Sequence, residues 1–245
     1  MNSLVDTTFD FRSDTPSGKD PDIYSPTLRR YHQILWSKPL PNGIKFDLIE
    51  NHETSYLYHA SQLGTFYLSS DTATHTFSKW KSMSHIIEKI PSCEIEEFRH
   101  MSYTIGSMLI FPSNRIDGKS TINGSRGFHP QIKDRIDLTL ECIRRYYLSE
   151  SSPLSEVLSR YRNFFELFGN FKNYVDFFLL NDLVEEIFEK IKFLLPFNNY
   201  HGSPVPRNIE DYLIYKSNTI NFIKNRNLRI SSYLEYSSNT SQRFN

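Results

Sequence analysis

The sequence has 245 residues, of which 38% are hydrophobic and 15% aromatic, enough apolar material for a folded core, so an intrinsically disordered chain is excluded. Its 28 Lys and Arg residues equal its 28 Asp and Glu residues in number, which excludes the strong basic excess typical of proteins that coat nucleic acids or membrane surfaces. Any charged partner must therefore be recognised by a local feature.

The numbers and spacing of the cysteines and histidines indicate where the protein is located and whether it binds a metal. The two cysteines, Cys93 and Cys142, are too few for a disulfide scaffold, and the eight histidines show no metal-ligand spacing. The N-terminus contains acidic residues and no apolar segment, unlike a secretory signal or a basic transit peptide. The longest apolar run, FFLL, is far shorter than the roughly 20 residues that cross a bilayer. We therefore expect a cytoplasmic protein without a membrane partner or a bound metal.

The N-terminal third predicts an arm, a helix and then strands. Residues 1–23 are polar and include the turn-rich TPSGKDPD, which indicates an irregular arm. The segment SPTLRRYHQILW predicts a helix with Ser25 as N-cap and Pro26 at its first position. After an Asn-Gly turn, the alternation in IKFDL predicts a strand over 44–48.

The middle of the chain reads mainly as β-structure. SYLYHA (55–60) and GTFYLSS (64–70) predict the two strands of a hairpin. The second half of 75–90 favours a helix. After an acidic stretch, the nearly continuous apolar run from Met108 to Phe111 predicts a central strand buried on both faces.

Beyond Pro130 the apolar residues recur with the 3.6-residue period of helices. The predicted helices are an amphipathic helix over 132–147, a helix from Ser152 to the C-terminal cap Gly169, a helix from Asn170 to Pro196 with a bend or break at Asn181-Asp182, and a last helix over 209–223.

The predicted fold class is α+β, with a mainly antiparallel sheet from the N-terminal half covered by a helical C-terminal half. No flexible linker separates the halves. We therefore predict an irregular N-terminal arm at 1–23, a single α+β domain at 24–230 and a flexible polar tail at 231–245, with a two-lobed arrangement as the open alternative.

The segment RIDGKSTINGSRGFHP, residues 115–130, contains three of the nine glycines amid four basic residues. Glycine lets a backbone adopt positive φ or admit another group closely. Arginines, free backbone N–H groups and the N-terminus of a following helix together favour an anion such as phosphate. The spacing matches neither the Walker A pattern nor the dinucleotide fingerprint. The alternative is an ordered strand-to-helix connection whose arginines pair with nearby aspartates.

Three long strings, SPTLRRYHQILWSKPLPNG, TIGSMLIFPSNRIDGKSTINGSRGFHP and DRIDLTLECIRRYYLSESSPLS, resemble a bacterial family of uncharacterised proteins. The resemblance covers most of residues 8–230. It implies a single-domain, intracellular bacterial protein, and it implies no activity, cofactor or catalytic residue.

The leading hypothesis is a cytoplasmic protein that binds a nucleotide or another phosphorylated small molecule at the 115–130 segment, with or without catalysis. The predicted anion- and ligand-binding residues are Arg115, Lys119, Asn123 and Arg126. The candidates for proton transfer are His129 and Glu141, although Glu141 also has the spacing of ordinary ion pairs with Arg144 and Arg145.

Two alternatives come from other classes of protein. In one, the basic segment together with Arg29 and Arg30 binds nucleic acid, as in a toxin or phage-defence effector. In the other, the protein is an interaction module without catalysis. The sequence fixes neither a cofactor nor the oligomeric state.

Overall fold

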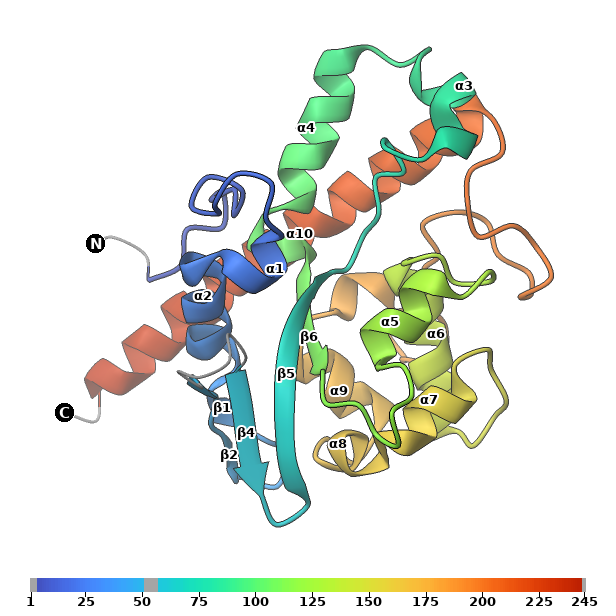
Figure 1. Ribbon diagram of the computed structural model, residues 1–245. Helices are drawn as coiled ribbons and strands as arrows, with labels where there is room; N and C mark the ends of the chain where they lie inside the picture. The colour runs from blue at the N-terminus through green and yellow to red at the C-terminus, as the bar shows by residue number, and fades with distance from the viewer. Residues whose placement is uncertain (1–3, 51–56, 244–245) are drawn as a thin grey trace.

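The computed structural model describes residues 4–50 and 57–243, and it confirms the α+β class. Figure 1 shows the sheet on one side of the molecule, a group of short helices beside it, and one long helix that runs across the back. The strands are β1 (Lys38–Pro39), β2 (Lys45–Phe46), β3 (Ile49–Glu50), β4 (Leu57–Ser61), β5 (Gly64–Thr72) and β6 (Met108–Pro112). The helices are α1 (Pro21–Tyr24), α2 (Pro26–Trp36), α3 (Ser84–Ile87), α4 (Ser92–Ser102), α5 (Ile122–Phe128), α6 (Ile136–Tyr147), α7 (Ser155–Arg160), α8 (Arg162–Glu166), α9 (Phe171–Phe177) and α10 (Ile209–Arg243).

The irregular arm packs on the body of the protein. Phe11 is fully buried, and its N–H donates to the carbonyl oxygen of Tyr103 at 3.1 Å. The helix predicted after the arm is confirmed as α2. The Ser25 hydroxyl accepts the N–H of Leu28 at 3.1 Å and thereby satisfies one free donor at the helix start.

The sheet has the antiparallel order β3-β4-β5-β6, and the predicted hairpin is confirmed as β4 and β5, with Leu57 opposite Leu68. Ser55 and Tyr56, the first residues of the predicted hairpin, lie outside the described residues. The strand predicted over 44–48 is shorter than expected. Within this range only β2, Lys45–Phe46, forms strand hydrogen bonds, and its partner is β1.

The prediction of a central strand at Met108–Phe111 is wrong in position. Within the described sheet β6 is the edge strand, paired only with β5, yet all five of its residues are buried. Helices cover it instead of a further strand. From α10, the fully buried Arg226 donates to the carbonyl oxygens of Met108 at 2.8 Å and Gly106 at 3.0 Å. A continuous apolar run in a strand therefore indicates that both faces of the strand are buried. It does not indicate that the strand lies in the centre of the sheet.

The helices of the second half are shorter than their periodicity predicts. The helix expected from Ser152 to Gly169 is broken at Tyr161 into α7 and α8. The helix expected over 132–147 starts at Ile136, and it is not simply amphipathic, because residues 136–143 are all buried.

The predicted helix from Asn170 to Pro196 is wrong beyond Phe177. Leu179 adopts the left-handed conformation with φ of 54°, which ends α9. A short 3₁₀ turn at 181–183 follows, and residues 184–208 are largely irregular. The four consecutive apolar residues of the FFLL run cannot all lie on one face of a helix. All four are buried in the core, and the helix ends within the run.

The last helix is longer than predicted. Composition predicts a polar tail from residue 231, whereas α10 continues to Arg243. Tyr233 lies one helical turn after the buried Ile230, and its ring lies 4.6 Å from the ammonium of Lys38. This packing on the body extends the helix into the polar segment. No described helix is both long and apolar enough to cross a membrane.

A buried ion pair fixes the irregular 184–208 segment. Arg135 and Asp137 are both almost fully buried, with Nε and Oδ1 3.0 Å apart. Asp137 Oδ2 accepts the N–H of Leu194 at 2.9 Å, and Arg135 donates to the carbonyl oxygen of Pro204 at 3.1 Å. The pair therefore anchors the irregular segment through its backbone at Leu194 and Pro204.

We expect Asp137→Ala to lower the free energy of unfolding by about 3–5 kcal/mol, because the buried Arg135 guanidinium loses its counter-ion. Urea unfolding followed by circular dichroism measures this change. Glu166→Ala, which removes an exposed partner of Arg162, is the matched control and should cost less than about 1 kcal/mol. Similar small losses for both variants would contradict the role assigned to the buried pair.

Candidate functional site

The basic 115–130 segment contains a helix that packs beside the sheet. Thr121 caps α5 by accepting the N–H of Gly124 at 3.2 Å, and Gly118 adopts a positive φ of 69° in the turn before it. Asn123 donates to the Ser69 hydroxyl of β5 at 3.2 Å. This bond ties α5 to β5, and Figure 1 shows α5 beside the sheet, next to β6.

Arg126 is fully buried between α5 and β5. It donates to Asp71 Oδ2 at 2.6 Å and lies 3.2 Å from Asp134 Oδ1, so two carboxylates share its single positive charge. Its Nε donates to the Thr139 hydroxyl at 3.2 Å, and its Nη2 donates to the carbonyl oxygens of Ala73 and Asp134. Every guanidinium nitrogen thus has a protein partner, and this side chain has no exposed face for a ligand.

The other predicted anion-binding residues point to different places. The Lys119 ammonium, on an exposed side chain, pairs with Glu156 of α7 at 3.0 Å. Arg115 is exposed at the start of the segment. Asn123 lies next to Arg126 along β5, and its Oδ1 is buried without a partner among the described residues. The structure therefore brings Asn123 and Arg126 together and leaves Arg115 and Lys119 apart from them.

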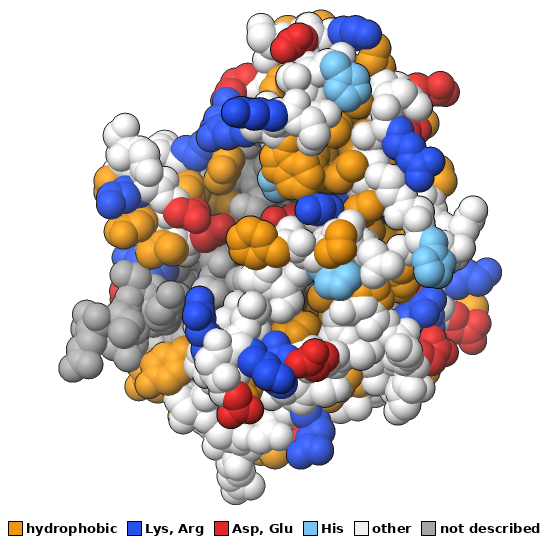
Figure 2. Space-filling view, turned by 45° about the vertical axis from the view of Figure 1, so that its right-hand side comes forward, with side chains coloured by type: hydrophobic (Ala, Val, Ile, Leu, Met, Phe, Trp, Pro, Cys, Tyr) orange, Lys and Arg blue, Asp and Glu red, His pale blue; other side chains and the backbone are white. Residues whose placement is uncertain are grey.

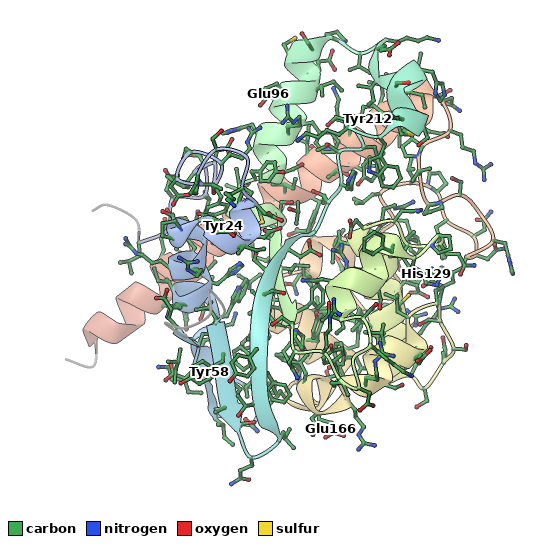
Figure 3. All side chains as sticks on the ribbon, viewed as in Figure 1. Tyr24, Tyr58, Glu96, His129, Glu166 and Tyr212 are labelled. Atoms are coloured by element: carbon green, nitrogen blue, oxygen red, sulfur yellow. The ribbon has the colours of Figure 1, made fainter. Side chains whose placement is uncertain are left out.

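The two residues predicted for proton transfer, His129 and Glu141, do not take part in the contact between α5 and β5. His129 follows α5, and Figure 3 shows it on the opposite side of β5 from Tyr24. Burial lowers its pKa, with a smaller effect from Lys133. Glu141 of α6 is nearly buried, and its oxygens lie 2.7 Å from both Arg144 and Arg145. These are the i,i+3 and i,i+4 ion pairs that its spacing allowed.

Four carboxylates gather around the C-terminal end of β5, and we call them the acidic cluster: Asp20, Asp22, Asp71 and Asp134. Burial raises the pKa of Asp22 well above its usual range, and the negative charges of Asp71 and Asp20 raise it further. Burial likewise raises the pKa of Asp71 to about 6, against the opposing effect of Arg126. Asp22 and Asp71 are therefore protonated at higher pH than exposed aspartates are.

Sequence reasoning missed Asp20, Asp22 and Asp71. A signal was present in YLSSDT, because aspartate is depleted in strands and a lone one inside a strand pattern marks an unusual environment. Asp20 and Asp22 stood in a segment interpreted only as an irregular arm. The fold brings that arm to β5, a contact that no local pattern reveals.

A directional hydrogen-bond chain holds Asp22. The Trp36 indole N–H donates to His32 Nδ1 at 3.0 Å, so the proton of this neutral ring is on Nε2. Burial, with a contribution from Arg226, lowers the pKa of His32 to about 3. His32 Nε2 lies 2.9 Å from the Ser70 hydroxyl and donates to it. The Ser70 proton is then directed to Asp22, whose carboxylate it stabilises.

A strained turn places Asp134 in the cluster. Lys133 and Asp134 both adopt left-handed φ values, 48° and 60°, which cost on the order of 1–3 kcal/mol each. Arg126 holds the turn by donating to the carbonyl oxygen of Asp134 at 2.8 Å. A Cβ on Gly127 would lie 3.2 Å from Asp134 Oδ1, so glycine lets the carboxylate approach α5. Strain of this kind concentrates at functional sites.

A cavity of about 130 Å³ adjoins the acidic cluster at the end of β5, and we call it the hydroxyl cavity. Its lining consists mainly of hydroxyl and basic side chains: Thr72, Thr74, His75, Thr76, Ser78, Lys79, Arg99, Ser102 and Tyr103. Asp22 and Asp20 raise the pKa of Tyr103, and Asp134 opposes the lowering of the His75 pKa, so the charges of the acidic cluster act on two residues of the cavity lining. Figure 2 shows a hollow at mid-height, with charged and histidine side chains in and around it and hydrophobic ones on its rim.

The cavity offers hydrogen-bond donors. His75 Nδ1 accepts the N–H of Phe77 at 2.8 Å, and burial lowers its pKa, so the neutral ring carries its proton on Nε2. Lys79 is exposed and has no ion-pair partner within the described part of the chain. Among the described residues, no three His, Cys, Asp or Glu side chains are arranged to hold a metal ion.

These features define an α+β protein with a donor-lined cavity beside a cluster of four aspartates, three of them partly buried. The chain belongs to a family of unknown function, DUF6994, whose model matches residues 5–230. This confirms the resemblance to an uncharacterised family. No curated protein and no solved structure matches the chain.

We expect stability to depend on pH through Asp71. Its pKa of about 6 in the folded protein exceeds the value of about 3.9 in an unfolded chain. Its stabilising contribution is therefore fully present below about pH 4 and is lost as pH rises through about 6. Relative to Asp71→Asn, the wild type should lose free energy of unfolding between pH 4 and pH 7.

Urea unfolding of both proteins at pH 4, 5, 6 and 7 measures this difference. Asp117→Asn, which removes an exposed carboxylate from the 115–130 segment, controls for the loss of one charge. A constant difference between the wild type and Asp71→Asn across this range would show that burial does not shift the Asp71 carboxyl.

Proposed function

We propose that the protein is an enzyme that binds a phosphorylated small molecule, a sugar phosphate or a nucleotide, at the hydroxyl cavity and transfers a proton through Asp71. The observation that carries this proposal is the position of a donor-lined cavity directly beside carboxyl groups with raised pKa values. Shifted carboxyl groups next to a cavity are typical of catalytic sites.

The cavity lining supports a phosphate as the group that enters it. Lys79 supplies positive charge, Arg99 supplies a guanidinium that is paired with Glu96 at 2.9 Å, and the Nε2–H of His75 and the hydroxyls supply neutral donors. No carboxylate is among the residues that line the cavity, although the carboxylates of the acidic cluster act on His75 and Tyr103 from outside its wall. A volume of about 130 Å³ suits one phosphate group, and the rest of the ligand would lie outside, toward Asp71.

The acidic cluster supports proton transfer and recognition of hydroxyl groups. A carboxyl group with a pKa of about 6 is populated in both protonation states near neutral pH, which suits a general acid or base. The remaining carboxylates and the unpartnered Oδ1 of Asn123 are acceptors for the hydroxyls of a sugar. Arg126 then acts by holding Asp71 in place, without touching the ligand.

This proposal moves the ligand from the 115–130 segment to the adjoining end of β5. The proposed ligand is still a phosphorylated small molecule, and Asn123 is still a ligand-binding residue. Four residues predicted from the sequence have no part in this site: Arg115, Lys119, His129 and Glu141. We include a cytoplasmic location in the proposal, supported by two free cysteines.

We expect a phosphorylated ligand to raise the thermal unfolding midpoint of the wild type, and Lys79→Ala to abolish the rise. The panel is inorganic phosphate, ribose 5-phosphate, glucose 6-phosphate, adenosine and uridine monophosphates, and a short RNA. A ligand at 100 times its dissociation constant adds about 2.7 kcal/mol of stability. Lys119→Ala is the matched control, because it removes an exposed lysine of the 115–130 segment.

The variants also separate the alternatives. Loss of binding in Lys119→Ala but not in Lys79→Ala would return the site to the 115–130 segment. Stabilisation only by RNA, growing with its length and falling steeply with salt, would favour a nucleic-acid interface. No stabilisation by any compound would favour an interaction module. For a ligand that binds, Asp71→Asn should retain binding and lose at least a hundredfold in turnover.

A further inference from the structure

A strained turn at residues 74–80 forms one wall of the hydroxyl cavity. Phe77 is fully buried and adopts the left-handed conformation, with φ of 55°. A bulky side chain keeps this conformation only where its surroundings hold it there. Its neighbours in the cavity lining are Thr74, His75, Thr76, Ser78 and Lys79. The backbone conformation of Phe77 therefore sets the shape of this wall.

One hydrogen bond holds the strained residue. The Phe77 N–H donates to Nδ1 of His75 at 2.8 Å, as the N–H two residues on donates to an aspartate or asparagine in an Asx-turn. The imidazole also packs on the Phe77 ring, with centroids 4.8 Å apart, and on Trp80 at 5.0 Å. Nδ1 can accept a hydrogen bond only when it carries no proton, so this turn requires the neutral ring.

The backbone just before Phe77 is anchored to α10. The Tyr215 hydroxyl donates to the carbonyl oxygen of His75 at 2.9 Å, and the Tyr212 hydroxyl donates to that of Thr76 at 3.0 Å. Figure 1 shows this stretch of chain rising from the end of β5 toward α3, alongside α10. A change of conformation at Phe77 therefore leaves the anchored residues in place and moves those that follow. The cavity residues that follow are Ser78 and Lys79.

Charged groups act on His75 from neighbouring elements. Burial lowers its pKa most, Arg126 of α5 lowers it further, and Asp134 in the turn before α6 opposes both. The Lys133 ammonium lies 5.5 Å from the centre of the Trp80 ring that packs on His75. From α10 come the neutral tyrosine hydroxyls. The other titratable residues of the cavity lining are Lys79, Arg99 and Tyr103. The ring is therefore neutral at pH 7 and takes up a proton at lower pH.

We propose that His75 is a pH-sensitive switch of the hydroxyl cavity. The neutral ring keeps the turn at Phe77 closed and thereby holds Lys79 at the cavity wall. The protonated ring carries a hydrogen on Nδ1, so the Phe77 N–H loses its acceptor, the strained residue relaxes and Lys79 leaves the wall. The effect on binding rests on the proposed function, because it concerns a phosphate ligand, whereas the movement of the turn does not.

Nuclear magnetic resonance of the protein without ligand tests the movement of the turn. The imidazole nitrogens of His75 and the amide proton of Phe77 are followed between pH 4.5 and pH 7.5. We expect the neutral ring to carry its proton on Nε2, and the Phe77 amide to lose its hydrogen bond with the same midpoint as the ring. A neutral ring protonated on Nδ1, or a Phe77 amide that stays hydrogen-bonded after His75 is protonated, would overturn the proposal.

Calorimetric titration with inorganic phosphate tests the effect on the cavity. His75→Asn keeps an acceptor for the Phe77 N–H and does not titrate, so its turn should stay closed at every pH. This variant loses the Nε2–H donor, so the pH profiles are compared and not the affinities themselves. From pH 7.5 to pH 4.5 we expect the dissociation constant to rise at least threefold more for the wild type than for His75→Asn. Protonation of phosphate itself affects both proteins alike.

His129→Asn is the matched control. His129 Nδ1 also accepts the N–H two residues on, from Gln131 at 3.2 Å, but His129 does not line the hydroxyl cavity. This variant should keep the pH profile of the wild type. Equal profiles for the wild type and His75→Asn would refute the switch and leave the proposed function standing.

The two proposals fail separately. If phosphate does not bind, the proposed function loses its support, and the magnetic resonance titration still decides whether His75 controls the turn. That titration uses the wild type alone, so it also decides the question if His75→Asn does not fold.

Discussion

The arrangement around β5 depends on one buried guanidinium, that of Arg126. It joins the strand through Asp71, the strained turn through Asp134 and helix α6 through Thr139. A buried cation needs such partners, because its transfer from water is costly without them. The same contacts place two carboxylates within reach of one another, so the group that stabilises the fold also sets the electrostatics of the acidic cluster.

Local chemistry explains which parts of the fold were predictable. The cap of α2 by Ser25 and the hairpin of β4 and β5 follow from short patterns, and the structure contains both. The helix after Asn170 ends early, because the FFLL run is surrounded by the core and gains nothing from a single helical face. Strand β6 is buried at an edge, since Arg226 of a distant helix satisfies its backbone.

The candidate site was predictable only in part. The glycine-rich basic segment pointed to the right neighbourhood, and Asn123 and Arg126 do meet β5. The positive charge of an arginine in the sequence does not show whether it binds a ligand or is buried in an ion pair. The carboxylates that pair with Arg126 come from β5 and from a turn after α5. Asp22 reaches the site through the packing of the arm, guided by Ser70 and His32. Such long-range partners leave no mark in local spacing.

Arg226 also has a consequence for the order in which the protein can fold. It donates to carbonyl oxygens of Gly106, Met108 and Phe178, and it lies in α10, far along the chain from β6. During synthesis, the backbone of β6 leaves the ribosome well over a hundred residues before this donor. The nascent chain must therefore keep these carbonyls hydrated until α10 emerges, and the core around β6 closes only after that helix has been made.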